Sequence, residues 1–300
     1  MVSKRKLYSY YLLTNPLTTI IPLTAFIVGS FVASGEQLLF GSLLYGGISL
    51  FILFISGCIL DDIGDKEIDR EFHPNHPLVT SDDSAQLSEK SAWALFFMLD
   101  VIGLSLAFVM IGIKFFLIML LYPMLALLYS IKPRITDWGV VGNATFIGFS
   151  VSLPFFAGAI LTDAISFQII AGSVVLLVLG TGLDLSKDFV KYYEDRKTER
   201  KNILDLLGID RGSKLIALST FLPYALSPVM FVIFNLKISY LIFTYISCFL
   251  LMVLAGEMTV VTPAESKEAA EKMERKTKGM MLIAYGVLEM SLIAIAISIL

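Results

Sequence analysis

The stretch LLFGSLLYGGISLFILFISGCILDDIGDKEID, residues 38–69, decides the fold class of this chain. Residues 38–60 contain no charged side chain, and about 20 apolar residues are enough for a helix to cross a bilayer. Residues 61–69 then contain six charged side chains, four of them aspartates. This abrupt change is typical of a transmembrane helix that reaches the aqueous surface. The stretch therefore predicts an integral membrane protein with an acidic cluster at the membrane surface.

The composition of the whole chain agrees with this prediction. The 300 residues are 56% hydrophobic and 16% charged, with a mean hydropathy of +0.79, whereas soluble domains carry about 25% charged residues. These values exclude a soluble enzyme, and they also exclude a disordered chain. The net charge of −3 gives no basic surface of the kind that nucleic acid needs, so we expect a lipid bilayer as partner and no nucleic acid.

Hydropathy predicts nine apolar segments, and we therefore expect an all-α, polytopic protein that forms one domain over residues 1–300. The N-terminal Lys4-Arg5-Lys6 and the apolar run after it resemble a signal peptide. That run is long and meets no small-residue cleavage site, so we expect it to be retained as the first span. The nine segments cover approximately residues 12–33, 38–60, 91–112, 114–131, 138–160, 165–186, 213–235, 238–261 and 279–300.

The distribution of basic residues predicts the orientation. Of the 23 lysines and arginines, 21 lie in the N-terminus and in four charged loops near residues 61–90, 132–137, 187–212 and 262–278, and only Lys114 and Lys237 lie on the other side. Cytoplasmic loops carry an excess of basic residues. We therefore expect a multi-pass protein of the cell membrane whose N-terminus and acidic loops are cytoplasmic.

The acidic stretch after the second segment predicts a metal site. On a helix, Asp62, Asp65 and Asp69 share one face, and Asp61 lies one turn before Asp65. Clustered carboxylates repel one another unless a cation neutralises them, and Mg²⁺ prefers oxygen ligands and substrate phosphates. We therefore predict all four aspartates as metal ligands.

A second acidic set follows the sixth segment, four segments after the first. It contains Asp184, Asp188 and Asp195, and we predict these three as metal ligands too. Basic side chains lie among them and are expected to contact phosphate oxygens directly. Two acidic sets on the same side of the membrane indicate metal-assisted chemistry on a diphosphate bound between them. The basic residues are Lys187, Lys191 and Arg196.

Three acids, Asp100, Glu257 and Glu289, fall inside predicted spans, where ionisable groups are costly and often functional. Two interpretations remain open for them. Each is a neutral acid hydrogen-bonded to a neighbouring helix, or it binds the acceptor or a proton. The second interpretation also supports a protein of another class, a cation- or proton-coupled transporter.

The acidic motifs resemble those of the UbiA superfamily of intramembrane prenyltransferases. Residues 61–69 match its motif Asn-Asp-x-x-Asp-x-x-x-Asp, with Asp61 in place of Asn, and Asn75-His76-Pro77-Leu78 resembles its Asn-Arg-Pro-Leu segment. Residues 187–196 resemble its second motif through Asp188 and Asp195, with Lys191 where many members have aspartate. The stretch around residues 129–158 is similar to members that act on archaeal ether lipids and on chlorophyllide. Asn15, His76 and Leu183 stand where the family often has arginine.

The resemblance implies a central cavity and a Mg²⁺-dependent transfer of a polyprenyl group from its diphosphate to a lipophilic acceptor. It implies catalytic roles for Asp62, Asp65 and Asp188, and for Tyr129 and Lys132, which would orient the diphosphate. Lys132 is thus also expected to bind the diphosphate, beside the basic residues of the second motif. The favoured acceptor is geranylgeranylglyceryl phosphate, in archaeal ether lipid synthesis. An aromatic quinone precursor and a tetrapyrrole remain alternatives.

Overall fold

A computed structural model describes residues 4–34, 40–83, 86–162, 165–185, 188, 192, 195–197, 202–220, 222–242, 244–245 and 268. All regular elements in these ranges are helical, which confirms the all-α class. The predicted ninth segment, most of the eighth, the charged loop 262–278 except for residue 268, and the acids Glu257 and Glu289 lie outside the described residues. The same is true of Lys187 and Lys191.

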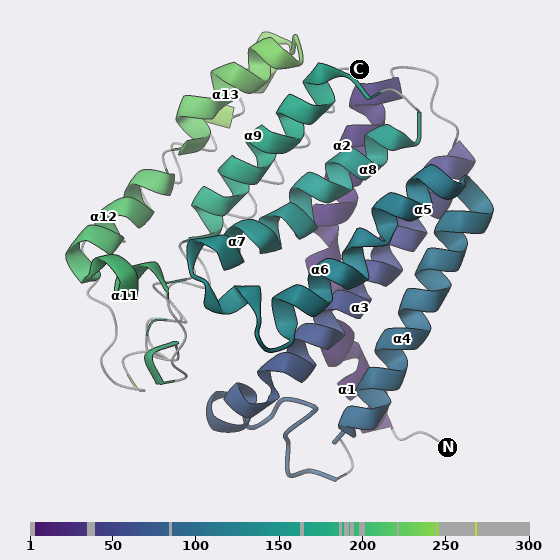
Figure 1. Ribbon diagram of the computed structural model, residues 1–300, viewed down its shortest axis with the longest axis vertical. Coiled ribbons are helices and arrows are strands. Elements are labelled where there is room, and N and C mark those ends of the chain that lie inside the picture. The colour runs from purple at the N-terminus through teal and green to yellow at the C-terminus, as the bar shows by residue number, and fades with distance from the viewer. Residues whose placement is uncertain are drawn as a thin grey trace.

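The described helices lie side by side in one bundle (Figure 1). Four are long and apolar enough to cross a membrane: α3 (Phe40–Phe72), α4 with its π-helical end η2 (Glu89–Ile111), α5 with α6 (Ile113–Ser130), and α7 through α8 (Val140–Ile160). Two shorter apolar helices are α2 (Ile20–Ser34) and α9 (Phe167–Asp184). These six coincide with the first six predicted segments.

The remaining elements are shorter. They are α1 (Lys4–Thr14), η1 (Pro16–Thr19), η3 (Ile135–Asp137), α11 (Ile203–Leu207), α12 (Ile209–Thr220) and α13 (Leu222–Ile233). Within the spans, α4 (Glu89–Leu106) leads into η2 (Ala107–Ile111), and α5 (Ile113–Met119) into α6 (Leu121–Ser130). The fifth span consists of α7 (Val140–Ile147), the π-helical turn η4 (Gly148–Ser152) and α8 (Leu153–Ile160).

The structure differs from the predicted boundaries at three places. Helix α3 continues to Phe72, so the acidic stretch that was assigned to a loop is helical. The first segment is broken at Asn15, whose φ of 38° ends α1 before Pro16. The predicted loop 187–212 contains α11 and the start of α12, because Asn202 caps α11 by accepting hydrogen bonds from the amides of Leu204 and Asp205.

Close helix packing holds the spans together. A methyl group at Gly29 on α2 would overlap the carbonyl oxygen of Phe155 on α8, and one at Gly158 on α8 would overlap that of Phe26 on α2. The two helix backbones therefore approach each other where only glycine fits. On the other side of the bundle, α3 packs against both α4 and α6. The C-terminal end of α3 and the segment between α6 and α7 lie at the same end of the bundle (Figure 1).

Candidate active site

The acidic end of α3, defined as Asp61, Asp62, Asp65 and Asp69, is built as one helical surface. Because α3 does not stop at Leu60, the predicted spacing of three carboxylates on one face is realised. Asp69 is buried, and the other three aspartates are half-buried. Partly buried carboxylates close together require cations or hydrogen-bond donors nearby.

His76 supplies positive charge to two of these carboxylates. Its Nε2 atom lies 3.3 Å from Oδ2 of Asp62, and its Nδ1 atom lies 3.4 Å from Oδ2 of Asp69. Burial lowers the pKa of His76, but the hydrogen bond with Asp62 and the charges of Asp62, Asp69 and Asp65 outweigh it, so the pKa is raised. An imidazolium between two carboxylates is thereby favoured. His76 stands where the family often has arginine, so this position still provides a cation.

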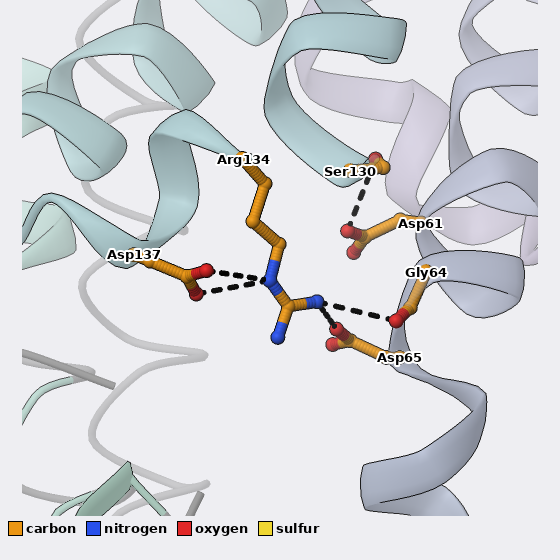
Figure 2. A network of polar contacts seen from close by, with 6 residues as sticks. All are labelled: Asp61, Gly64, Asp65, Ser130, Arg134 and Asp137. Atoms are coloured by element: carbon orange, nitrogen blue, oxygen red, sulfur yellow. Dashed lines mark hydrogen bonds and ion pairs between the residues drawn. The ribbon is translucent and has the colours of Figure 1, made fainter. Parts of the chain in front are cut away.

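Arg134 supplies positive charge to a third carboxylate, as Figure 2 shows. Its Nη1 atom donates to Oδ1 of Asp65 at 2.6 Å and to the carbonyl oxygen of Gly64 at 3.3 Å. Its Nε atom donates to both carboxylate oxygens of Asp137, at 2.9 and 3.1 Å. Only 4% of the Arg134 side chain is exposed. The segment after α6 is therefore fastened to the acidic end of α3 by a buried, charge-assisted contact.

The backbones of α3 and α6 are in close contact beside these carboxylates. A methyl group at Gly64 would overlap the carbonyl oxygen of Ser130, the last residue of α6. The Ser130 hydroxyl donates to Oδ1 of Asp61 at 3.3 Å (Figure 2). Gly64, which separates Asp62 from Asp65 in the sequence, is thus the position that lets α6 reach the carboxylates.

Two cavities meet at Asp61. The larger one, of about 710 Å³, has Asp61 and Asp62 in its wall and extends to Asn15 and His76. The smaller one, of about 50 Å³, lies between α3, α6 and α7 with η4, and its wall includes Asp61 and Phe149. The two share Phe54, Cys58, Asp61 and Phe146 as lining residues. A wide mouth with two carboxylates in its wall and a narrow apolar pocket therefore adjoin at Asp61.

The second acidic set is organised around α11. Asp188 is 7% exposed, and its carboxylate accepts from the Asn143 amide at 3.2 Å and from the backbone amide of Ile203 at 2.8 Å. The Asn202 amide donates to Oδ2 of Asp195 at 3.0 Å. Asp184, at the end of α9, is 3% exposed. All three acids are thus buried, and amide donors orient Asp188 and Asp195.

Contacts connect the two acidic sets. Lys197, next to the second set, lies 3.3 Å from Glu71 near the end of α3. Tyr129 is half-buried on α6, and the carboxylates that act electrostatically on its hydroxyl include Asp61 of the first set and Asp184 of the second. Tyr129 therefore lies near carboxylates of both acidic sets, and its role toward the diphosphate stays a prediction.

Of the basic residues predicted to bind the diphosphate, the two that the structure describes lie on the surface. Lys132 and Arg196 are exposed, and the guanidinium of Arg196 lies 5.7 Å from the ring centre of Tyr192. The buried cation of the Lys132 loop is Arg134, which the sequence analysis missed, as it missed the roles of Asn143 and Asn202. The only signal for Arg134 was its position in the same short charged loop, two residues after Lys132.

The donor atoms at the mouth fit a divalent cation held partly by substrate. Among the described residues, no group of three His, Cys, Asp or Glu side chains is placed to enclose a metal ion. Mg²⁺ is usually held by one or two carboxylates together with substrate phosphates. Asp61 and Asp62, adjacent in the wall of the larger cavity, offer such a pair.

The intramembrane acid Asp100 has a local partner. The Ser56 hydroxyl donates to Oδ1 of Asp100 at 2.6 Å, and Asp100 is 8% exposed between α3 and α4. This contact corresponds to the first of the two interpretations, an acid hydrogen-bonded to a neighbouring helix.

Comparisons with known proteins agree with these features. A model of the UbiA prenyltransferase family matches residues 22–284. Digeranylgeranylglyceryl phosphate synthase of Methanocaldococcus jannaschii is 27% identical over 289 residues, which cover 94% of this chain and 95% of that protein. The protein of the same name from Methanosphaera stadtmanae is 26% identical over 249 residues, 81% of this chain and 85% of the relative.

Solved structures share the fold. A structure of digeranylgeranylglyceryl phosphate synthase in membranes has a TM-score of 0.69 at 21% identity, covering 98% of each chain. A UbiA homologue from Archaeoglobus fulgidus bound to GPP and Mg²⁺ has a TM-score of 0.63 at 18% identity, covering 93% of this chain and 99% of that one.

Proposed function

The chain belongs to the UbiA prenyltransferase family, and from this premise we propose that it transfers a geranylgeranyl group from its diphosphate to geranylgeranylglyceryl phosphate. It is a multi-pass membrane prenyltransferase. The named relatives are synthases of digeranylgeranylglyceryl phosphate, the product that this transfer would give. The observation that carries the proposal is the junction, at Asp61, of a wide cavity with two carboxylates in its wall and a narrow apolar pocket.

The acidic end of α3 would bind the diphosphate through a cation. Asp61 and Asp62 would hold Mg²⁺, which when bound supplies positive charge to the departing diphosphate. The same ion is named with a prenyl diphosphate in the Archaeoglobus fulgidus homologue. Asp65, Asp69 and the second set, Asp184, Asp188 and Asp195, remain proposed ligands. Asp61 and Asp62 are favoured as the first pair because both lie in the wall of the larger cavity, whereas Asp65 is paired with Arg134.

The reaction then breaks one bond and forms another. The bond between C1 of the prenyl chain and the diphosphate oxygen breaks, and the diphosphate leaves with the electron pair. A glycerol hydroxyl of the acceptor attacks C1, an ether bond forms, and the hydroxyl proton is released. The apolar pocket beside Asp61, lined by Phe54, Phe146 and Phe149, would keep water from the allylic cation.

Basic and hydroxyl groups would orient the diphosphate. We propose this role for Lys132, Lys187, Lys191 and Arg196, with Tyr129 beside both acidic sets. We also propose one catalytic domain over residues 1–300, with the N-terminus and the acidic loops in the cytoplasm. The support for this orientation is the excess of lysine and arginine in the loops next to the acidic motifs.

The test is prenyl transfer by the purified protein in detergent. Geranylgeranyl diphosphate is supplied with geranylgeranylglyceryl phosphate, an aromatic quinone precursor or a tetrapyrrole, with Mg²⁺ or EDTA, and products are detected by mass spectrometry. We expect Mg²⁺-dependent product with the first acceptor. We expect Asp62→Ala to abolish it and Glu67→Ala to retain it, because Glu67 lies on the same helix but is exposed and paired with Arg70. Product with another acceptor only would refute the proposed substrate, and full activity of Asp62→Ala would refute the proposed metal site.

A further inference from the structure

The pocket beside Asp61 runs along three helices away from the acidic end of α3. On α3 its wall passes from Asp61 through Gly57 to Phe54, a rise of about 10 Å at 1.5 Å per residue. On α6 it passes from Ser130 to Ala126, and on the fifth span from Thr145 to Phe149. With the diphosphate at Asp61, the prenyl chain would enter this pocket from its first carbon onward.

Phe149 ends the pocket. Its ring stacks on Phe54 with a centroid distance of 5.3 Å and contacts Tyr122 at 4.6 Å. A methyl group at Gly57 would lie 2.9 Å from the Phe149 ring, so the ring crosses from the fifth span to the backbone of α3. The far end is thus closed by the rings of Phe149 and Phe54, with Tyr122 behind Phe149.

The volume of the pocket limits how much of a prenyl chain can lie between Asp61 and the Phe149 ring. The pocket holds about 50 Å³, whereas an apolar cavity of about 150 Å³ holds a single benzene ring. Only the start of a geranylgeranyl chain therefore fits within the pocket as it is closed by Phe149, and the rest of the chain would lie outside the pocket.

The backbone at Phe149 is unusual as well. Phe149 lies on η4, a π-helical turn inside the fifth span. Such turns are rare and are frequently found at functional sites. Behind the Phe149 ring, Tyr122 is fully buried, and its hydroxyl has no hydrogen-bond partner among the described residues. Packing alone therefore holds Tyr122 against the closed end of the pocket.

We infer that Phe149 is the residue that determines how far a donor chain penetrates the protein, and hence which prenyl diphosphates are good substrates. This inference rests on the proposed prenyl transfer, and it names a specificity-determining side chain for the donor. Gly57 is its counterpart, because the missing side chain there makes room for the ring. A smaller side chain at position 149 would open the pocket toward Tyr122 and admit further isoprene units.

The experiment compares kcat/KM for geranylgeranyl and dimethylallyl diphosphate in the wild type, Phe149→Leu and Phe149→Ala. Adding or removing one methylene in an apolar pocket changes kcat/KM by about tenfold or more. We therefore expect the ratio of the long to the short donor to rise at least about tenfold in Phe149→Ala, and less in Phe149→Leu. The control is Phe156→Ala, whose ring packs on the core formed by α2, the fifth span and α9, and which should leave the ratio unchanged.

A second readout does not need the acceptor. Unreactive thiolodiphosphate analogues of both chain lengths should raise the midpoint of thermal unfolding. In both Phe149 variants, the rise with the long analogue relative to the short one should be larger than in the wild type. An active wild type whose ratio is unchanged in both variants would refute the inference alone. Should Phe149→Ala fail to fold, an unchanged ratio in Phe149→Leu would do so. A wild type that forms no product with any donor would refute the proposed function, and this inference with it.

Discussion

Replacing Gly64 by alanine tests whether the acidic end of α3 depends on its close contact with α6. The added methyl group would overlap the Ser130 carbonyl oxygen, which is backbone and cannot rotate away. The two helices must separate, and this weakens the hydrogen bond from Ser130 to Asp61 and the contact of Arg134 with the Gly64 carbonyl. No charge is removed, so any effect comes from shape.

The magnitude follows from two opposing effects. Overpacking a well-packed site costs about 1–3 kcal/mol, whereas alanine stabilises a helix interior by about 1 kcal/mol relative to glycine. The matched control is Gly41→Ala on the same helix, where a methyl group meets nothing within 4 Å. Gly64→Ala should therefore be less stable than Gly41→Ala by the overpacking cost alone, about 1–3 kcal/mol.

The measurements are the midpoint of thermal unfolding in detergent and the rate of prenyl transfer with Mg²⁺. For a domain of 150–250 residues, 1 kcal/mol shifts the midpoint by about 2–4 °C. We expect Gly64→Ala to unfold several degrees below Gly41→Ala and to lose most of its activity. Equal midpoints together with wild-type activity would show that the approach of α6 to α3 does not hold the site.

Three further substitutions test individual contacts. Arg134→Met should lower the free energy of unfolding by about 2 kcal/mol, which is less than the loss of a fully buried ion pair costs, because Asp65 is partly exposed. Adding Asp65→Asn should restore part of the unfolding midpoint. Tyr122→Phe removes a buried hydroxyl without a partner among the described residues, so its midpoint should be unchanged or higher, and a drop would reveal a missing partner. Asp100→Asn should keep the unfolding midpoint and the activity, because an amide oxygen still accepts from Ser56. Asp100→Leu removes the acceptor and should lower the free energy of unfolding by about 1 kcal/mol. Loss of activity in Asp100→Asn would favour a proton-carrying role.

The sequence was sufficient to predict the acidic end of α3, and the reason is local. An apolar run fixes where the helix begins, and helical periodicity alone then places Asp62, Asp65 and Asp69 on one face. The continuation of α3 to Phe72 was not predicted. Hydropathy reports where a chain leaves the membrane and gives no information on whether the helix continues into water.

The partners of these carboxylates could not be predicted, because they come from distant parts of the chain. Arg134 contacts Asp65 across 69 residues, and nothing in the local pattern distinguishes it from the exposed Lys132. In the second set, the spacing of Asp184 and Asp188 indicated two ligands one turn apart. This spacing could not reveal that the Asp188 carboxylate accepts from Asn143 and from the first amide of α11, and the ligand assignment stays a prediction.

The four carboxylates of α3 thus have different surroundings. Asp65 is paired with Arg134, and His76 lies between Asp62 and Asp69, so the chain itself supplies cations to three of the four. Asp61 and Asp62 line the larger cavity, and Asp61 also borders the apolar pocket. If all four depended equally on an external cation, four like charges would repel one another whenever it was absent. Because Arg134 and His76 offset this repulsion, the helix can present Asp61 and Asp62 to a cation and a diphosphate without losing its own packing.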